Sequence, residues 1–344
     1  MASKEHNATM TELANNPGFP LNKCIDLESF EWLFSYQPQF MWVIFIMSFI
    51  ENLFVISVFV LHKSRCTVTE IYLGNMAAAD LIFVIGHPFR ALYVSHNYYW
   101  PFGGFMCVAV FSLFLLNLYS SIYFLMMVSI ERYLTLVKAT SIGHLRRSWW
   151  ARVRCGIIWM LAAVLCMPNA MLRQVLIDER SNTTTCVSVR SSPNWYIAIN
   201  VIINVLGFLV PMVVTTACTS QMILVLRNNP MRRWKKEKKE RRATWLVLSV
   251  FLVFIVCWFP FNISTFINIL NEFNVLRSCR LTSDNYIVYN ISIYLVNCNS
   301  CINPVLYCML GNRFRQKARE VYSRLLCKGP DRWRPSTQLR FLSP

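Results

Sequence analysis

Seven long apolar segments constrain this chain more than any other feature. They are expected at about 39–61, 71–94, 105–130, 153–171, 195–226, 243–270 and 285–310. A helix needs roughly 20 mostly apolar residues to cross a bilayer. Backbone polar groups in lipid must be satisfied within each segment, so each one is expected to be helical. The sequence therefore predicts an all-α membrane protein built as a bundle of seven transmembrane helices.

The positive charges are distributed unevenly between the loops. The chain has 34 lysines and arginines against 17 acidic residues, a formal net charge of +17. With the N-terminus outside, all but eight of the basic residues lie on the inner side, where basic loops are retained. We therefore expect a multi-pass protein of the plasma membrane with an extracellular N-terminus and a cytoplasmic C-terminus. The basic loops are expected to contact anionic lipid and not nucleic acid.

The loops are too short for a soluble domain. We expect an extracellular segment over 1–37, the transmembrane bundle over 38–310, a helix on the inner membrane surface over 311–327, and a short cytoplasmic tail over 328–344. The segment 311–327 is basic and amphipathic, which is typical of a helix lying at a membrane interface. Its apolar face is formed by Phe314, Val321, Leu325 and Leu326.

Covalent modification is expected at both ends of the chain and in one outer loop. Asn7 and Asn182 begin acceptor sequons on the outer side, so both are candidate glycosylation sites. Cys327 follows the amphipathic segment directly and is a candidate palmitoylation site.

Four of the 13 cysteines fall on the oxidising outer side, namely Cys24, Cys107, Cys186 and Cys279. Four cysteines allow three pairings. Cys107 begins the third span and Cys186 lies in the second outer loop, whereas the other two lie in the N-terminal segment and the third outer loop. We favour Cys107–Cys186 and Cys24–Cys279.

Charged and amide side chains occur inside the apolar segments, where they are costly and usually functional. Glu131-Arg132-Tyr133 stands at the inner end of the third segment. Asp80 lies in the middle of the second. Candidate neighbours at similar depth are Asn52, Asn117, Ser121, Asn299, Ser300 and Asn303. One buried asparagine is easily a packing residue, but four spans contributing polar groups at one depth favour an internal hydrated network.

Short motifs occur in order, one set per segment, and together they resemble the signatures of rhodopsin-like G protein-coupled receptors over about residues 38–327. They are Asn52, Asp80, Cys107, Glu131-Arg132-Tyr133, Trp159, Pro211, Cys257-Trp258-Phe259-Pro260 and Asn303-Pro304-Val305-Leu306-Tyr307. Longer stretches, such as Leu61–Phe83 and Cys257–Phe266, resemble the bradykinin (kinin) receptors, nearest to the type 2 subtype. A receptor without enzymatic activity is therefore expected.

The resemblance implies roles for residues in the inner half of the bundle. Residues implied in activation and G-protein coupling are Glu131, Arg132, Tyr133, Trp258, Pro260, Asn303, Pro304 and Tyr307. Residues implied in a structural sodium site are Asp80, Asn117, Ser121, Asn299 and Ser300. The family also implies coupling to the phospholipase C-activating class of G protein, a rise in cytosolic calcium, and no other cofactor.

The ligand implied by the resemblance is an extracellular peptide of the kinin type. Residues expected to line its pocket are Arg90, Phe114, Phe261, Asn262, Asn268, Asp284 and Tyr294. Three positions depart from the family: Arg90 replaces a tryptophan, Asn268 replaces an aspartate, and Tyr286 replaces an acidic residue. Since kinins are strongly cationic and acidic residues are their natural partners, an angiotensin-like or des-Arg kinin peptide remains an alternative.

Arg90 is expected to face the pocket and meet a ligand carboxylate or a pocket acid. The alternative is that its side chain snorkels to the lipid headgroups on the outer side.

Other classes of function are less well supported by the residues. A transporter or channel would need a continuous polar path and repeated or broken helices, and only the Asp80 group suggests a path. An intramembrane enzyme would need paired aspartates or a metal cluster. The tail after Cys327 offers only Ser336, Thr337 and Ser343 as phosphoacceptors, so arrestin recruitment through tail phosphorylation is expected to be weak.

Overall fold

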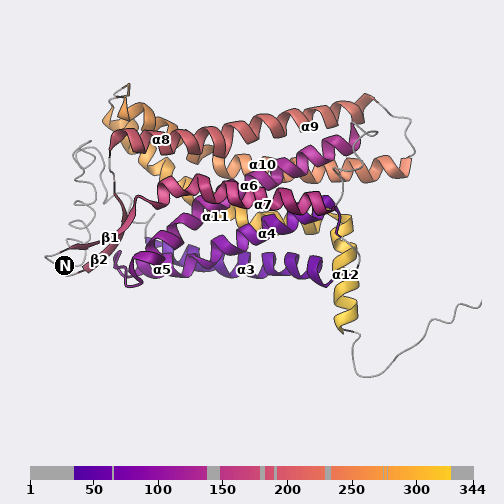
Figure 1. Cartoon of the computed structure of the whole chain (residues 1–344), viewed down its shortest axis with the longest axis horizontal. Coiled ribbons are helices and arrows are strands. Elements are labelled where there is room, and N and C mark those ends of the chain that lie inside the picture. Colours follow the sequence, from indigo (N-terminus) through magenta and orange to yellow (C-terminus); the bar gives the residue numbers. More distant parts are fainter. Residues whose placement is uncertain are drawn as a thin grey trace, which may run out of the picture.

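A computed structural model describes residues 35–63, 66–137, 148–178, 183–189, 192–228, 234–273, 275–276 and 278–326. Long helices lie side by side along the length of the molecule, and a small hairpin covers one end (Figure 1). In the described part of the chain, six helices are long and apolar enough to cross a membrane. A seventh, α11, meets this test together with α12, from which it is bent by 86°. The architecture is that of a seven-helix transmembrane bundle.

The spans lie close to the predicted segments. The first four are α3 (Gln37–Leu61), α4 (Val68–Ile85) continued by α5 (His87–Ser95), α6 (Gly103–Leu136) and α7 (Ser148–Ala170). The fifth is α8 (Pro193–Asn204), η3 (Val205–Leu209) and α9 (Val210–Asn228) in succession, and the last two are α10 (Trp234–Glu272) and α11 (Cys279–Leu310). Helix α12 (Asn312–Leu326) crosses the inner end of the bundle.

Two helices extend beyond the ends of the predicted apolar segments. Helix α6 continues to Leu136, so Glu131-Arg132-Tyr133 lies within the helix and not at its end. Helix α10 begins at Trp234, inside the basic stretch that precedes the sixth apolar segment. Lysine, arginine and glutamate are good helix formers. A charged sequence can therefore continue a helix beyond the membrane, where hydropathy gives no signal.

Two spans are interrupted near a proline, which lacks an N–H donor. Gly86 separates α4 from α5, two residues before Pro88. The π-turn η3 ends two residues before Pro211. Gly207 in this turn lies so close to α6 that a Cβ there would be 3.2 Å from Leu118 and Tyr119 side-chain atoms. A backbone carbonyl of η3 also accepts a hydrogen bond from α6, because the Tyr123 hydroxyl donates to the Leu206 oxygen at 3.0 Å.

Helix α6 lies at the centre of the bundle. Its residues Leu118, Tyr119 and Ile122 are fully buried in a core that also contains Trp258 of α10 and Tyr307 of α11. The outward faces of the other spans carry large apolar side chains, as expected for helices surrounded by lipid. The core is therefore a column around α6, and polar groups within it are shielded from lipid.

An antiparallel hairpin in the second outer loop is the main element that the sequence did not predict. Strands β1 (Arg173–Asp178) and β2 (Thr183–Ser188) pair with Val175 opposite Cys186. Because Cys186 is bonded to Cys107 at the start of α6, the hairpin is held over the outer end of the bundle. The predicted Cys107–Cys186 pairing is confirmed.

Candidate functional site

A cavity of about 560 Å³ opens at the outer end of the bundle, between α5, α6, β1, α8, α10 and α11. Four residues expected in a ligand pocket line it: Arg90, Phe114, Phe261 and Asn268. Its other lining residues include Phe111, Arg173, Tyr196, Asn285, Tyr286 and Tyr289. The cavity therefore has aromatic walls, amide groups and two arginines.

Three other expected pocket residues lie away from the cavity lining. Asn262 is buried and donates to the Trp258 carbonyl at 2.9 Å, one turn back along α10. Asp284 is exposed and lies 4.0 Å from Arg280 on the outer surface. Tyr294 packs its ring against Phe40 of α3, with 4.7 Å between ring centroids. A position near the outer end of a span is thus not sufficient to place a side chain in the cavity.

The floor of the cavity is a cluster of aromatic rings. Phe114 lies 5.6 Å from Trp258 and 5.5 Å from Phe261, centroid to centroid. Phe254 stacks on the Trp258 ring with 5.7 Å between centroids. The Trp258 indole nitrogen is buried and has no hydrogen-bond partner among the described residues. Such a ring is held by packing alone, so a ligand that presses on Phe114 or Phe261 also presses on Trp258.

Arg173 is the functional candidate that sequence reasoning missed. It begins β1, and its guanidinium lies 4.5 Å from the Phe111 ring centroid, on the cavity wall. Burial lowers the pKa of Arg173. One signal in the sequence could have found it, namely the expected disulfide. A loop tied to α6 through Cys186 must cross the outer end of the bundle, and its residues then face inward.

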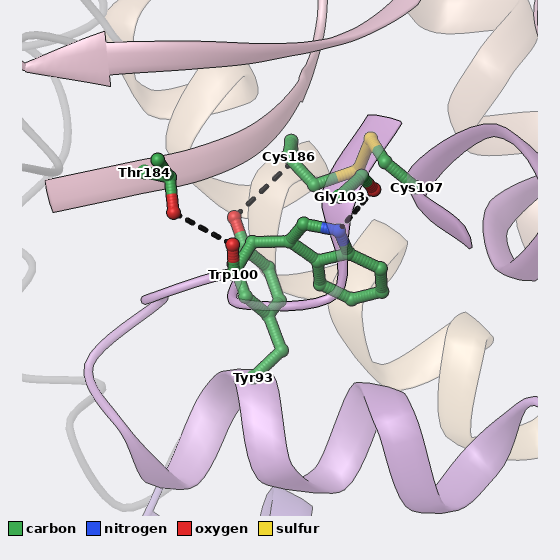
Figure 2. The surroundings of a disulfide bond; sticks show 6 residues. All are labelled: Tyr93, Trp100, Gly103, Cys107, Thr184 and Cys186. Atoms are coloured by element: carbon green, nitrogen blue, oxygen red, sulfur yellow. Dashed lines mark hydrogen bonds between the residues drawn. A yellow bond between two sulfur atoms is a disulfide. The ribbon is translucent and has the colours of Figure 1, made fainter. Parts of the chain in front are cut away.

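A set of hydrogen bonds locks the hairpin to the first outer loop (Figure 2). The Trp100 backbone N–H donates to the Thr184 backbone oxygen at 2.7 Å, and the Thr184 hydroxyl donates to the Trp100 backbone oxygen at 2.6 Å. The Trp100 indole N–H donates to the Gly103 oxygen at 2.9 Å, and the Tyr93 hydroxyl donates to the Cys186 oxygen at 3.2 Å. The hairpin is therefore held beside the disulfide by Tyr93 of α5 and Trp100 of the first outer loop, and this attachment also restrains Arg173 in β1.

Thr184→Val is expected to loosen this attachment. The substitution keeps the shape of the side chain but removes the hydroxyl, leaving the Trp100 oxygen without that partner. A net loss of about 1 kcal/mol in unfolding free energy is expected for one such bond. Thr184 also completes the sequon at Asn182, so both variants are made in an Asn182→Gln background. Thermal unfolding of the purified protein measures the loss, with Thr185→Val, at the next position of the strand, as the matched control. Equal unfolding temperatures for the two variants would contradict this assignment.

A second group of polar side chains lies deeper, around the fully buried Asp80. Asn117 of α6 donates to one carboxylate oxygen at 2.8 Å, and Asn303 of α11 donates to the other at 3.1 Å. Asn117 also donates to the Ser121 hydroxyl at 3.2 Å. The structure therefore brings α4, α6 and α11 together around one carboxylate.

The other residues expected beside Asp80 belong to α3 and α11, and all of them are buried. Asn52 of α3 donates to the Ser300 backbone oxygen at 2.9 Å. Side-chain oxygens of Asn299, Ser300 and Asn303 are buried without a hydrogen-bond partner among the described residues. Unsatisfied buried oxygens near a carboxylate are the kind of donor set that a small hard cation or ordered water takes.

The inner end of the bundle holds the remaining predicted residues. Glu131 is buried on α6, and the Thr135 hydroxyl donates to its backbone oxygen at 2.7 Å. Tyr307 is buried on α11, with its hydroxyl lacking a hydrogen-bond partner in the described chain. Pro260 and Pro304 each lie inside an unbroken helix. Arg132 and Tyr133 share the half-buried inner part of α6.

Helix α12 is attached to the end of α3 and the start of α4 by a hydrogen bond and an ion pair. Lys317 lies 2.9 Å from Glu70, which also forms a capping box with Thr67 at the start of α4. Glu320 lies 2.9 Å from the ring of His62, and this hydrogen bond holds the pKa of Glu320 below its usual value. Phe314 and Val321 are buried, as predicted, whereas Leu325 is exposed. The amphipathic helix is thus fixed through its polar side as well as its apolar one.

Comparison with known proteins decides the family. The sequence model of the 7 transmembrane receptor (rhodopsin family) matches residues 51–307. The chain belongs to the rhodopsin-like family of G protein-coupled receptors. It is therefore a receptor and not an enzyme, and a multi-pass protein of the plasma membrane. The family signature predicted from the ordered motifs is confirmed.

Within this receptor family, the chain is similar to kinin receptors. It is 45% identical to the human B2 bradykinin receptor over 331 residues, covering 96% of this chain and 85% of that one. It is 46% identical to the guinea pig (Cavia porcellus) B2 bradykinin receptor over 310 residues, 90% of this chain and 83% of that one. Identity to the B1 bradykinin receptor of Tupaia minor is 33% over 305 residues, 88% and 87% of the two chains. The predicted resemblance to the type 2 subtype is confirmed.

Several predicted features of the receptor lie outside the described residues. They are Cys24, the sequons at Asn7 and Asn182, Cys327, and the tail residues Ser336, Thr337 and Ser343. Cys279 itself is disulfide-bonded. Its pairing with Cys24 stays a prediction.

Proposed function

We propose that the chain is a cell-surface receptor for a kinin-like peptide, with its N-terminus outside and its C-terminus in the cytoplasm. Identity of about 45% to B2 bradykinin receptors along nearly the whole chain is the observation that carries this proposal. The outer cavity supports it, because a volume of about 560 Å³ under a fixed hairpin suits one end of a peptide. The receptor then signals through a phospholipase C-activating G protein and raises cytosolic calcium.

A calcium assay tests the proposal directly. Cells expressing the receptor are exposed to bradykinin, des-Arg kinins and angiotensin, with and without an inhibitor of phospholipase C. We expect a receptor-dependent calcium rise with a kinin and its loss with the inhibitor. Responses to angiotensin alone, or none to any peptide, would contradict the kinin assignment. A kinin response that survives the inhibitor would contradict the proposed G-protein class.

A des-Arg kinin is the second candidate ligand. Asn268 and Tyr286, which stand where acidic residues are expected in kinin receptors, both line the cavity. None of the described residues of that lining is acidic. A peptide end without a guanidinium therefore fits this lining better than one that carries it. The order of potency between the two kinin forms decides between them.

The route from ligand to G protein is proposed to follow the buried polar groups. Ligand contact with Phe114 and Phe261 displaces Trp258, and α10 bends at Pro260. Rearrangement around Asn303, Pro304 and Tyr307 then frees the inner end of α6. Glu131 holds Arg132 at rest, and Arg132 with Tyr133 meets the G protein after release. Arrestin binds weakly, because the tail has few phosphoacceptors.

Sodium is proposed to bind at Asp80, with Asn117, Ser121, Asn299 and Ser300 completing the site. The carboxylate and the unsatisfied oxygens of α11 fit a hard cation. A bound cation neutralises the buried charge and holds α4, α6 and α11 together, which favours the resting arrangement.

Asp80→Asn is expected to abolish the effect of sodium on agonist affinity. The amide keeps the size of the side chain but removes the charge that attracts the cation. Agonist binding to membranes in sodium chloride and in choline chloride measures the effect, with Asp284→Asn on the outer surface as the control. An unchanged sodium effect in Asp80→Asn would exclude this site.

A further inference from the structure

A hydrogen bond joins the fifth and sixth spans beside the cavity. The side chain of Asn204, the last residue of α8, donates from Nδ2 to the Thr265 hydroxyl of α10 at 2.9 Å. The same Nδ2 donates to the Asn200 backbone oxygen at 2.8 Å. Because a carbonyl oxygen can only accept, this second bond fixes which end of the amide faces Thr265. The bond between the two spans therefore has a defined donor and a defined acceptor.

The π-turn η3 sets the direction of the Asn204 side chain. This turn begins at Val205, directly after Asn204, and the Val210 N–H donates to the Val205 oxygen five residues back. A π-turn holds one residue more than a turn of α-helix, and such turns are frequent at functional sites. One residue corresponds to a rotation of about 100° around a helix. A regular α-helix through this region would therefore turn Asn204 away from α10.

The bond continues as a chain of hydrogen bonds toward the floor of the cavity. The Thr265 hydroxyl donates to the Asn262 backbone oxygen at 3.0 Å. The Asn262 side chain in turn donates to the Trp258 backbone oxygen at 2.9 Å. Thr265 and Asn262 are both buried, so these bonds are shielded from water. Since Trp258 precedes Pro260 and Thr265 follows it, the chain of bonds extends across the proline of α10.

Restraint on both sides of a proline opposes bending at that proline. Pro260 lacks the N–H that would bond to the Val256 oxygen, so this turn is the easiest place for α10 to bend. The bonds within α10 hold the turn itself, and the bond to Asn204 holds the segment beyond it against α8. Bending at Pro260 would move Thr265 relative to Asn204 and break the bond between the spans. The intact bond therefore favours the present arrangement of α10.

A ligand in the cavity can reach this bond. Thr265 and Asn200 both line the cavity, on α10 and α8 respectively. A peptide main chain carries both N–H and C=O groups. It can therefore bond to the Thr265 hydroxyl, or to the Asn200 oxygen, in place of Asn204. Exchange of one hydrogen bond for another costs little, whereas loss without replacement is costly.

We propose that the Asn204–Thr265 bond is a latch that holds the fifth and sixth spans in the resting arrangement and that a peptide in the cavity opens. Asn204 and Thr265 are then positioning residues for activation, and Asn262 connects them to Trp258. The proposal rests on the proposed function in that α10 bends at Pro260 during activation. It adds a point at which the ligand acts on the fifth span, and it gives a role to Asn262, which lies away from the cavity lining.

Removal of the Thr265 hydroxyl tests the latch. Thr265→Val keeps the shape of the side chain, and loss of one hydrogen bond is expected to raise agonist-independent nucleotide exchange on a purified G protein about two- to tenfold. Thr265→Ser keeps the hydroxyl and is expected to stay close to the wild type. Thr215→Val is the matched control, because the buried Thr215 hydroxyl has no partner among the described residues. Rates are compared at equal amounts of receptor.

Two results would overturn the latch in a receptor whose agonist response is intact. One is an unchanged or lower basal rate in Thr265→Val. The other is an equal rise in Thr265→Ser or in Thr215→Val, since the hydrogen bond between the spans is then not the cause.

A second variant removes the other partner of the bond. Asn204→Leu is expected to raise the basal rate as Thr265→Val does. The double variant Asn204→Leu/Thr265→Val is expected to show no further rise, because both changes break the same bond and such effects are not additive. Rises that multiply in the double variant would show two independent effects and would overturn the latch.

A measurement without peptide or G protein separates failure of the latch from failure of the proposed function. Hydrogen–deuterium exchange of the purified receptor reports how readily a helical turn opens. We expect faster exchange over residues 258–265 in Thr265→Val than in Thr265→Ser. If the receptor activates no G protein, the proposed function fails, and this faster exchange would still support the latch. Equal exchange in the two variants would overturn it.

Discussion

Arg132→Ala is expected to remove nearly all G-protein activation while peptide affinity stays close to that of the wild type. The physical reason is the separation of the two ends of the bundle. Arg132 lies on the inner part of α6, beyond the buried Asp80 group, whereas the cavity residues lie at the outer end. A guanidinium on a long side chain is well suited to reach carbonyl and carboxylate groups of a cytoplasmic partner.

Nucleotide exchange on a purified G protein measures this loss, and radioligand competition on the same membranes measures affinity. Arg319→Ala on the exposed face of α12 is a suitable control, since it also removes an arginine from the inner end of the bundle. Exchange at the wild-type rate in Arg132→Ala would reject the role given to this residue. Loss of peptide binding as well would mean that the substitution damages the fold.

Lys317→Ala on α12 is expected to destabilise the receptor strongly. The side chains of Lys317 and Glu70 are only 13% and 9% exposed, so removal of the lysine leaves a carboxylate buried without its partner. Breaking such a pair costs about 3–5 kcal/mol. For a large helical domain this corresponds to a fall of several degrees in unfolding temperature.

The double variant Glu70→Gln/Lys317→Met separates two free energies. One is the destabilisation caused by a buried carboxylate without its cation, and the other is the net stabilisation that the ion pair contributes. Both charges are then absent, and the remaining groups pack with similar volume. We expect it to be more stable than Lys317→Ala, because buried ion pairs contribute little beyond mutual compensation. Equal destabilisation of the two variants would show that direct attraction is the main contribution. Thermal unfolding in detergent distinguishes these results.

The spans could be predicted because lipid imposes a simple rule on composition, and the depth of Asp80 could be predicted because neighbouring spans fix it. The breaks at Gly86 and η3 could not, since they depend on how each proline-containing helix meets α6. The same holds for pocket residues, where Arg90 reaches the cavity and Tyr294 packs against Phe40. The apolar segment that contains a residue fixes its depth in the membrane, but not the direction in which its side chain points.

Contacts between distant parts of the chain were the least predictable. Glu70 and Lys317 are 247 positions apart, and each alone resembles an ordinary charged residue at a helix end. Arg173 gave no signal of its own, because its position depends on the register of β1 with β2. The disulfide did give a signal, since few cysteines lie on the outer side.

The two attachments of α12 differ in their access to water, and this has a consequence for handling the protein. The Glu70–Lys317 pair is nearly enclosed, whereas the Glu320 side chain is 39% exposed. Dissolved salt screens exposed pairs far more than enclosed ones. At high ionic strength the Glu320–His62 contact, which is an ion pair only when the His62 ring is protonated, should therefore weaken more than the Glu70–Lys317 pair. Phe314 and Val321 stay buried whatever the salt content, so buffers of different ionic strength would change this one contact and leave the helix docked.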